Sequence, residues 1–204
     1  MYKTQAETRA FFRAFLPMVA GANHCDIIVA PPFTAIAAAV ELSGDRRFPI
    51  PPASLEEGIR RTYWPGRLER IATETVEWIL DVAHNPAGAW ALRAGLRHVL
   101  RDEDARTLVF SCLRDKPLDE LAQILFPLFD EVIVAPLHTA RAAALDDLLA
   151  AAETTGTPTV ATESVRDALR LAEERSAGGV AVVSGSVYLV GEARSILRAR
   201  RGKA

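Results

Sequence analysis

The sequence predicts an α/β protein whose sheet is mainly parallel and is covered by helices on both faces. Two observations support this fold class. From residue 67 onward, short apolar stretches rich in β-branched residues alternate with longer stretches of helical periodicity, and such alternation is typical of parallel sheets with crossover helices. The composition is also ordinary for a globular protein, because half of the residues are hydrophobic and a quarter are charged.

The expected elements follow one another closely along the chain. Adjacent strands are expected over residues 67–73 and 76–81, joined across Glu74 and Thr75. The alternation that follows predicts helix 86–100, strand 107–112, helix 117–126, strand 131–135, helix 141–152, strand 158–161, helix 164–175, strand 179–184 and helix 187–199. The carboxyl ends of the parallel strands then meet at one edge, where ligands bind in open α/β sheets.

A separate α-β-α segment is predicted before this sheet. Thr4 and Glu7 are spaced as a capping box, and large apolar side chains then recur at helical spacing until Gly21. A buried strand is expected over residues 26–30, and a helix over 35–40 after two prolines. Left alone, these apolar faces would be exposed. We therefore expect them to dock on the later domain, extending its sheet at an edge, or to pair with a second copy as a homodimer.

Residues 43–52 interrupt the pattern. They contain a glycine, two arginines and three prolines within ten residues, a composition typical of loops and linkers. We therefore expect three parts: an α-β-α segment over residues 1–42, a linker over 43–52, and the α/β domain over 53–204.

The charge and cysteine content argue against several classes of function. The net charge is −2, so no global field favours nucleic acid or an anionic membrane, and we expect neither as a partner. No apolar run approaches the ~18 residues that a membrane-spanning helix needs. Cys25 and Cys112 form no CxxC pair, and no His/Cys cluster has metal-ligand spacing. We expect a reduced, cytoplasmic protein without a metal site.

Two short runs carry the candidate site, WPGRLE at residues 64–69 and DVAHNP at residues 81–86. Arg67 offers a fork of donors that suits phosphate or carboxylate. Asp81 is a hydrogen-bond acceptor at the carboxyl end of a strand. Ser186 lies at the start of the last helix, where backbone N–H groups favour an anion.

Several of these residues also have a purely structural interpretation. Asp81 and Asn85 can simply cap the backbone that follows them. A histidine near a helix start, here His84, commonly serves as a structural hydrogen-bonding group. Asp115 and Lys116 are interpreted as a turn with a solvated ion pair.

The three tryptophans are expected to serve the fold. Trp78 on a strand and Trp90 on a helix are expected in the core rather than as surfaces for base stacking. Trp64, just before a Pro-Gly turn, is expected to anchor the start of the domain.

Three further stretches, at residues 113–116, 135–137 and 184–186, follow the two runs in the order of a known family. With them, residues 48–197 resemble the C-terminal, Rossmann-like domain of folylpolyglutamate synthase/dihydrofolate synthase, a member of the Mur ligase family. That family uses ATP and Mg²⁺ to turn a carboxylate into an acyl phosphate. The amine of glutamate then attacks the acyl phosphate to form an amide.

The resemblance implies a role for each site residue. Arg67 and Asp81 would contact ATP, His84 would lie near the reacting phosphate and glutamate as the catalytic candidate, and Ser186 would help to hold glutamate. However, the sequence contains no GxxxxGK[ST] loop, so the β- and γ-phosphates have no cradle. We expect no ligase activity from this chain alone, no required cofactor and at most weak binding of ATP.

Residues 2–42 resemble a different family, triosephosphate isomerase, and the most specific element is VAPPFT at residues 29–34. The segment lacks the family's substrate-binding lysine and its catalytic histidine and glutamate, so no isomerase activity is expected. Two unrelated resemblances in one chain favour a non-catalytic chimera, made by laboratory recombination or by an unusual fusion. The alternatives are a nucleotide-binding module, and a lobe that completes a folate ligase with a separate ATP-binding polypeptide.

Overall fold

The computed structural model describes residues 4–24, 57, 60–61, 63–101 and 104–201. The chain divides into two compact units, Met1–Thr62 and Tyr63–Ala204, which we describe separately. The predicted linker at 43–52 lies outside the described residues, so the division into 1–42, 43–52 and 53–204 stays a prediction.

The described part of the first unit is mainly one helix, α1 (Gln5–Val19). Its capping box is confirmed, because the Thr4 hydroxyl accepts from the Glu7 N–H at 3.2 Å and the Glu7 carboxylate accepts from the Thr4 N–H at 2.8 Å. The strand and helix expected over residues 26–40 lie outside the described residues. Docking of this segment, or its pairing as a homodimer, therefore stays a prediction.

The described part of the second unit contains a six-stranded sheet in the order β1-β2-β6-β3-β4-β5. The first pair, β1 and β2, is antiparallel, and every other neighbouring pair is parallel. The strands are β1 (Glu69–Ala72), β2 (Glu77–Leu80), β3 (Arg106–Phe110), β4 (Glu131–Val134), β5 (Thr159–Ala161) and β6 (Val180–Ser184). The predicted fold class is confirmed.

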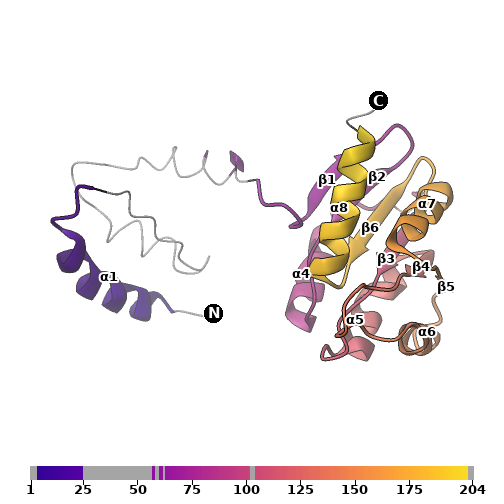
Figure 1. Ribbon diagram of the computed structural model, residues 1–204, viewed down its shortest axis with the longest axis horizontal. Helices are drawn as coiled ribbons and strands as arrows, with labels where there is room; N and C mark the ends of the chain where they lie inside the picture. Colours follow the sequence, from indigo (N-terminus) through magenta and orange to yellow (C-terminus); the bar gives the residue numbers. More distant parts are fainter. Residues whose placement is uncertain (1–3, 25–56, 58–59, 62, 102–103, 202–204) are drawn as a thin grey trace. The chain divides into compact units, whose positions relative to one another are not determined.

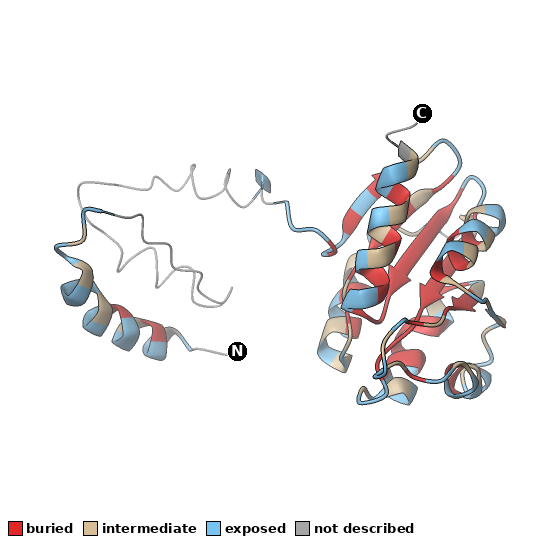
Figure 2. Ribbon diagram, viewed as in Figure 1, coloured by how far each residue is buried: buried red, intermediate tan, exposed pale blue. Residues whose placement is uncertain are grey.

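Helices cover both faces of this sheet, as Figure 1 shows. One face packs against α4 (Pro86–Leu96), α5 (Leu118–Leu125) and α6 (Leu145–Glu153). The other packs against α7 (Val165–Arg175) and α8 (Val187–Arg201). A short 3₁₀ turn, η2 (Phe126–Leu128), follows α5. Figure 2 shows the result, with buried strands in the middle and helices whose outer faces are exposed.

The central strand β6 explains why these residues form a parallel sheet. All five of its residues are buried, because α4 and α5 cover one face of the sheet and α7 and α8 cover the other. A strand buried on both faces needs a continuous apolar run rather than an alternating one, and Val180–Ser184 supplies it in the sequence VAVVS.

Three local predictions are corrected by the structure. The helix expected over 141–152 begins only at Leu145, because residues 141–143 pair instead with the loop after β3 through backbone hydrogen bonds. Trp90 is not a core residue but is 56% exposed on α4, with the Arg93 guanidinium 5.6 Å from its ring. Trp64 is 68% exposed and therefore does not anchor the domain, whereas Trp78 is fully buried as predicted.

Among the described residues, no helix is both long enough and apolar enough to cross a membrane. The cytoplasmic location stays a prediction.

Candidate functional site

The candidate site lies at the edge where the parallel strands β2, β6 and β3 end. The chain just after β2 runs beside the chain just after β6, since the Asp81 N–H donates to the Val183 carbonyl and the Gly185 N–H donates to the Ala83 carbonyl, each at 3.0 Å. The 81–86 run and the 184–186 stretch, which are about one hundred residues apart in sequence, are thereby neighbours.

Gly185 makes this close arrangement possible. Its φ is 104°, and a Cβ built there would lie only 2.4 Å from the Ser111 carbonyl oxygen. No side chain fits at such a distance, so only glycine lets the end of β6 pass this close to the end of β3. The glycine therefore fixes where Ser186 and the start of α8 lie.

Asp81 holds the loop that carries Arg67. The side chain is only 7% exposed, and its two oxygens accept from the N–H groups of Ala83 and Leu68, each at 2.9 Å. Burial raises the pKa of Asp81, while these two hydrogen bonds and the positive charge of Arg67 oppose the rise. Both carboxylate oxygens are thus engaged by the protein's own backbone.

His84 and Asn85 follow Asp81 in the same turn. The Nδ1 atom of His84 lies 2.8 Å from the Val82 carbonyl oxygen. A carbonyl can only accept, so Nδ1 carries the proton and a neutral ring keeps its lone pair on Nε2. Asn85 caps α4 by accepting from the Gly88 N–H at 2.8 Å, which confirms the capping interpretation for this residue.

Ser186 is buried at the start of α8, with 2% of its surface exposed. Its hydroxyl oxygen accepts from the Tyr188 N–H at 3.2 Å, and its carbonyl accepts from the Val190 N–H at 3.0 Å. The hydroxyl therefore caps the helix and retains its own O–H as a donor for a ligand oxygen. The positive end of the helix dipole also points toward the site.

Arg67 lies in a tight loop at the same edge. Its N–H donates to the Trp64 carbonyl at 3.1 Å, and its neighbours Gly66 and Leu68 have positive φ values of 68° and 45°. Its side chain is exposed. The structure therefore brings Arg67, Asp81, His84 and Ser186 onto neighbouring loops, although Asp81 and Ser186 are the buried members.

Further along this edge, Asp115 pairs with Lys116 at 3.2 Å and with Arg141 at 3.0 Å. Hydrogen bonds from Arg141 and Lys116 lower the pKa of this exposed carboxyl. The predicted turn with a solvated ion pair is confirmed, with Arg141 as an additional partner.

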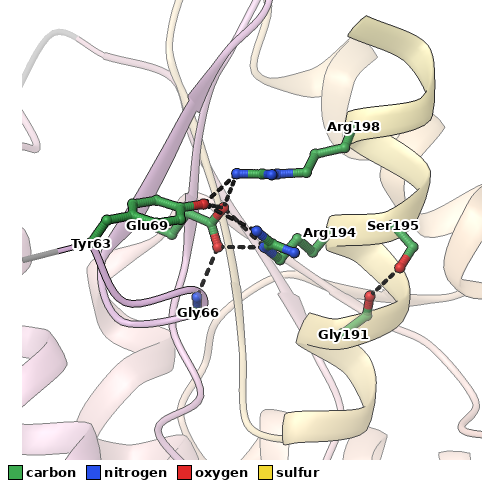
Figure 3. Close-up of polar contacts among 7 residues, drawn as sticks. All are labelled: Tyr63, Gly66, Glu69, Gly191, Arg194, Ser195 and Arg198. Carbon is green, nitrogen blue, oxygen red and sulfur yellow. Dashed lines mark hydrogen bonds and ion pairs between the residues drawn. The ribbon is translucent and has the colours of Figure 1, made fainter. Parts of the chain in front are cut away.

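The sequence did not connect four residues that support the candidate site, Glu69, Tyr63, Arg194 and Arg198, which Figure 3 shows together. Glu69 is buried and contacts Arg194, Arg198 and Tyr63. The only local signal was the position of Glu69 at the end of the WPGRLE run. Its arginine partners lie 125 and 129 residues away in sequence.

The described residues offer neither a metal site nor a reactive thiol. No group of three or more His, Cys, Asp or Glu side chains there could hold a metal ion. Cys112 is buried, and burial together with the negative charge of Asp115 raises the pKa of its thiol to about 11. That thiol is therefore a poor nucleophile near neutral pH.

A family comparison identifies this domain. Residues 66–187, more than half of the chain, match the family model described as Mur ligase, glutamate ligase domain. The chain belongs to this Mur ligase family. The matched range begins inside the loop that carries Arg67 and ends just after Ser186, so it contains all four candidate residues of the Mur ligase domain.

Curated relatives extend the similarity beyond the matched domain. The dihydrofolate synthase/folylpolyglutamate synthase of Mycobacterium tuberculosis is 38% identical over 151 residues, which are 65% of this chain and 30% of the relative. The corresponding protein of Bacillus subtilis is 28% identical over 166 residues, 80% of this chain and 37% of the relative. The chain therefore spans about a third of the length of these relatives.

Solved structures show the same similarity. A structure of Mycobacterium tuberculosis folylpolyglutamate synthase complexed with ADP and AMPPCP has a TM-score of 0.69 at 29% identity, covering 80% of this chain and 39% of the other. E. coli FolC in complex with DHPP and ADP has a TM-score of 0.71 at 27% identity, covering 88% and 42%.

The second resemblance is also confirmed. The triosephosphate isomerase of Solibacter usitatus is 58% identical over 41 residues, which are 20% of this chain and 16% of the isomerase. A short isomerase similarity beside a Mur ligase domain is consistent with the predicted chimera.

Proposed function

We propose that the Mur ligase domain is the glutamate- and nucleotide-binding lobe of an ATP-dependent folate:glutamate ligase, and that a separate ATP-binding lobe completes its active site. The observation that carries the proposal is the gathering of Arg67, Asp81, His84 and Ser186 on neighbouring loops at the carboxyl edge of β2 and β6. Relatives solved with ADP, AMPPCP and DHPP support the ligand classes.

Each residue has a chemical role that fits its environment. The exposed guanidinium of Arg67 can pair with a phosphate oxygen. His84 offers the Nε2 lone pair to a proton that leaves the attacking amine. Ser186 and the first N–H groups of α8 can bind a carboxylate of glutamate. Asp81 shapes the loop through its hydrogen bonds, and its contact with ATP stays a prediction.

The proposal requires a second lobe for the phosphate chemistry. The sequence contains no GxxxxGK[ST] loop, and in enzymes of this chemistry that loop holds the β- and γ-phosphates and a Mg²⁺ ligand. We therefore expect no ligase activity from this chain alone. ATP is a substrate of the assembled ligase rather than a resident cofactor.

A mixing experiment tests the proposal. The chain is combined with an isolated ATP-binding lobe of a folylpolyglutamate synthase, and glutamate-dependent ATP hydrolysis is measured for the mixture and for each part. We expect hydrolysis in the mixture only, and its loss with His84→Ala. Equal rates in the mixture and in the ATP-binding lobe alone would contradict the proposal.

The second candidate is a chimera without catalytic function, which the short isomerase similarity favours. It predicts no activation in the mixture and no heat when the chain is titrated with an ATP analogue at millimolar concentration. Measurable binding to the chain alone would argue against it.

A further inference from the structure

The carboxylate of Glu69 is the centre of a buried polar network at the start of β1. Its side chain is 1% exposed, and its oxygens accept from the Arg194 Nε atom at 2.8 and 3.0 Å and from the Arg198 guanidinium at 3.2 Å. The Tyr63 hydroxyl also donates to it. Figure 3 shows Tyr63, at the start of the second unit, and the two arginines of α8 converging on the Glu69 carboxylate.

The same carboxylate holds the backbone beside Arg67. Its Oε2 atom accepts from the Gly66 N–H at 2.8 Å, and the Gly66 carbonyl in turn accepts from the Val82 N–H at 2.8 Å. A Cβ on Gly66 would lie 3.0 Å from Val82 and 3.1 Å from Val190, so this residue is enclosed by both neighbours. Both polar groups of its backbone are thus fixed from different sides.

The residue on the other side of Arg67 is strained and held as well. Leu68 has a φ of 45°, a region that costs a non-glycine residue about 1–3 kcal/mol. Its N–H donates to Asp81 at 2.9 Å, and its side chain packs where Gly95 of α4 has none. Strain of this kind persists only where surrounding contacts impose it, and such residues cluster at functional sites.

Arg67 therefore lies between two residues that are each held by a buried carboxylate. Among the residues that the structure describes, its own guanidinium has no hydrogen-bond partner, although it is attracted to Asp81. The two arginines of α8 neutralise Glu69, so the carboxylate nearest in sequence does not compete with a ligand for Arg67.

We propose that Glu69 and Arg194 form a positioning pair that fixes Arg67 for a phosphate-bearing ligand. This rests on the proposed function, in which Arg67 contacts ATP. Glu69 is too buried to touch the ligand itself. Because Arg194 lies on the helix that begins after Ser186, the pair also locks the Arg67 loop to the helix end that would bind glutamate.

Local amide exchange, measured on the full chain, tests whether the pair fixes the loop. The variant Glu69→Gln is compared with the wild type, and Arg194→Gln provides a milder change that leaves the Gly66 bond in place. In Glu69→Gln, we expect the amides of Gly66 and Leu68 to exchange on the order of tenfold faster than in the wild type. This is the effect of losing about one charge-assisted hydrogen bond. Amides of β3 and β4 should accelerate by no more than the loss of global stability, which urea unfolding of the same variant measures.

Arg200→Gln is the matched control, because Arg200 lies on the same helix and pairs with Glu173 at 3.0 Å rather than with the loop. It should leave the exchange of Gly66 and Leu68 unchanged. If Glu69→Gln lowers the stability measured by urea unfolding but leaves Gly66 and Leu68 at their wild-type exchange rates, Glu69 serves only global stability and the positioning role is overturned.

Titration with AMPPCP then connects the loop to ligand binding. We expect Arg67→Gln to abolish binding without changing loop exchange, and Glu69→Gln to weaken it on the order of tenfold through the loop. Wild-type affinity in a Glu69→Gln protein whose loop exchanges faster would overturn the proposal. If the wild type binds no AMPPCP, the proposed nucleotide role fails, and the exchange data still decide whether Glu69 fixes the loop.

Discussion

The two edges of the sheet hold the same kinds of polar groups in opposite surroundings. At the carboxyl edge, Glu69 accepts from a backbone N–H and from an arginine, with a side chain that is 1% exposed. At the amino edge, Asp130 likewise accepts from the Arg106 N–H at 2.8 Å and from the Arg106 guanidinium at 3.1 Å, but its side chain is 56% exposed.

The difference shows which edge can position a ligand-binding residue. A hydrogen bond that is buried away from water is strong and costly to break. At an exposed carboxylate, water can replace the lost partner. A hollow of about 960 Å³ lies at the amino edge, around the β1–β2 turn and Gly178, yet none of the four candidate residues lines it. Burial of the supporting groups, rather than the size of the hollow, is therefore our reason for proposing the carboxyl edge as the site.

The largest expected effect comes from the two ends of β6. Gly185→Ala places a Cβ 2.4 Å from a backbone oxygen at a φ of 104°, so we expect a loss of about 3–4 kcal/mol in the free energy of unfolding. Gly178→Ala, at a φ of 80° with nothing within 4 Å, should cost about 1–2 kcal/mol. Urea unfolding measures both, and equal losses would remove the distinction between the edges.

The next largest loss of stability is expected when the buried carboxylate of Glu69, rather than the exposed one of Asp130, is removed. Glu69→Ala leaves the Gly66 N–H without its acceptor and removes the negative charge between Arg194 and Arg198. Since both arginines reach solvent, we expect a loss of about 2–3 kcal/mol rather than the full cost of a buried unpaired charge. Asp130→Ala should cost less than about 1 kcal/mol. A larger loss for Asp130→Ala than for Glu69→Ala would reverse the comparison.

A smaller effect is the pH dependence of stability, which has opposite signs for the buried carboxylates of Glu69 and Asp81. Burial pushes the pKa of Glu69 up, but hydrogen bonds from Tyr63, from the Gly66 N–H and from Arg194 outweigh it and leave the pKa below its usual 4.5. Glu69 therefore stabilises the fold above about pH 4.5, and this contribution is lost as the pH falls through the folded-state pKa. Burial raises the pKa of Asp81 above its usual 3.8. The contribution of Asp81 to the stability of the fold therefore declines as the pH rises above 3.8.

Unfolding measured between pH 3 and pH 7 checks these signs. The stability difference between the wild type and Glu69→Gln should shrink as the pH falls below about 4.5. Because asparagine mimics the neutral acid, the wild type should lose stability relative to Asp81→Asn as the pH rises. Parallel curves for the wild type and both variants would contradict the assignment of these carboxylates.

The strands and the sheet edge at which the candidate residues gather could be predicted from the sequence, because both depend on local patterns. The apolar run of β6 and the Asn85 cap are readable over a few residues. The network around Glu69 could not be predicted, since its partner Arg194 comes from a helix 125 residues away and is indistinguishable in sequence from a solvated arginine. The exposure of Trp90 could not be predicted either, because it depends on which side of α4 faces the sheet, and tertiary packing decides that.

The smallest loss of stability is expected at Asp115, an exposed carboxylate that shares its position at the carboxyl edge with the buried Asp81. Asp115 lies beyond the carboxyl end of β3, as Asp81 lies beyond that of β2, but its side chain and that of Arg141 are 47% and 58% exposed. The lowered pKa of Asp115 reflects hydrogen bonds from Arg141 and Lys116 that water and salt can replace. We therefore expect Asp115→Asn to leave the urea midpoint unchanged at physiological salt. A shift as large as that of Glu69→Ala would mean that the carboxyl edge itself, rather than the exclusion of water from Glu69 and Asp81, determines the strength of these contacts.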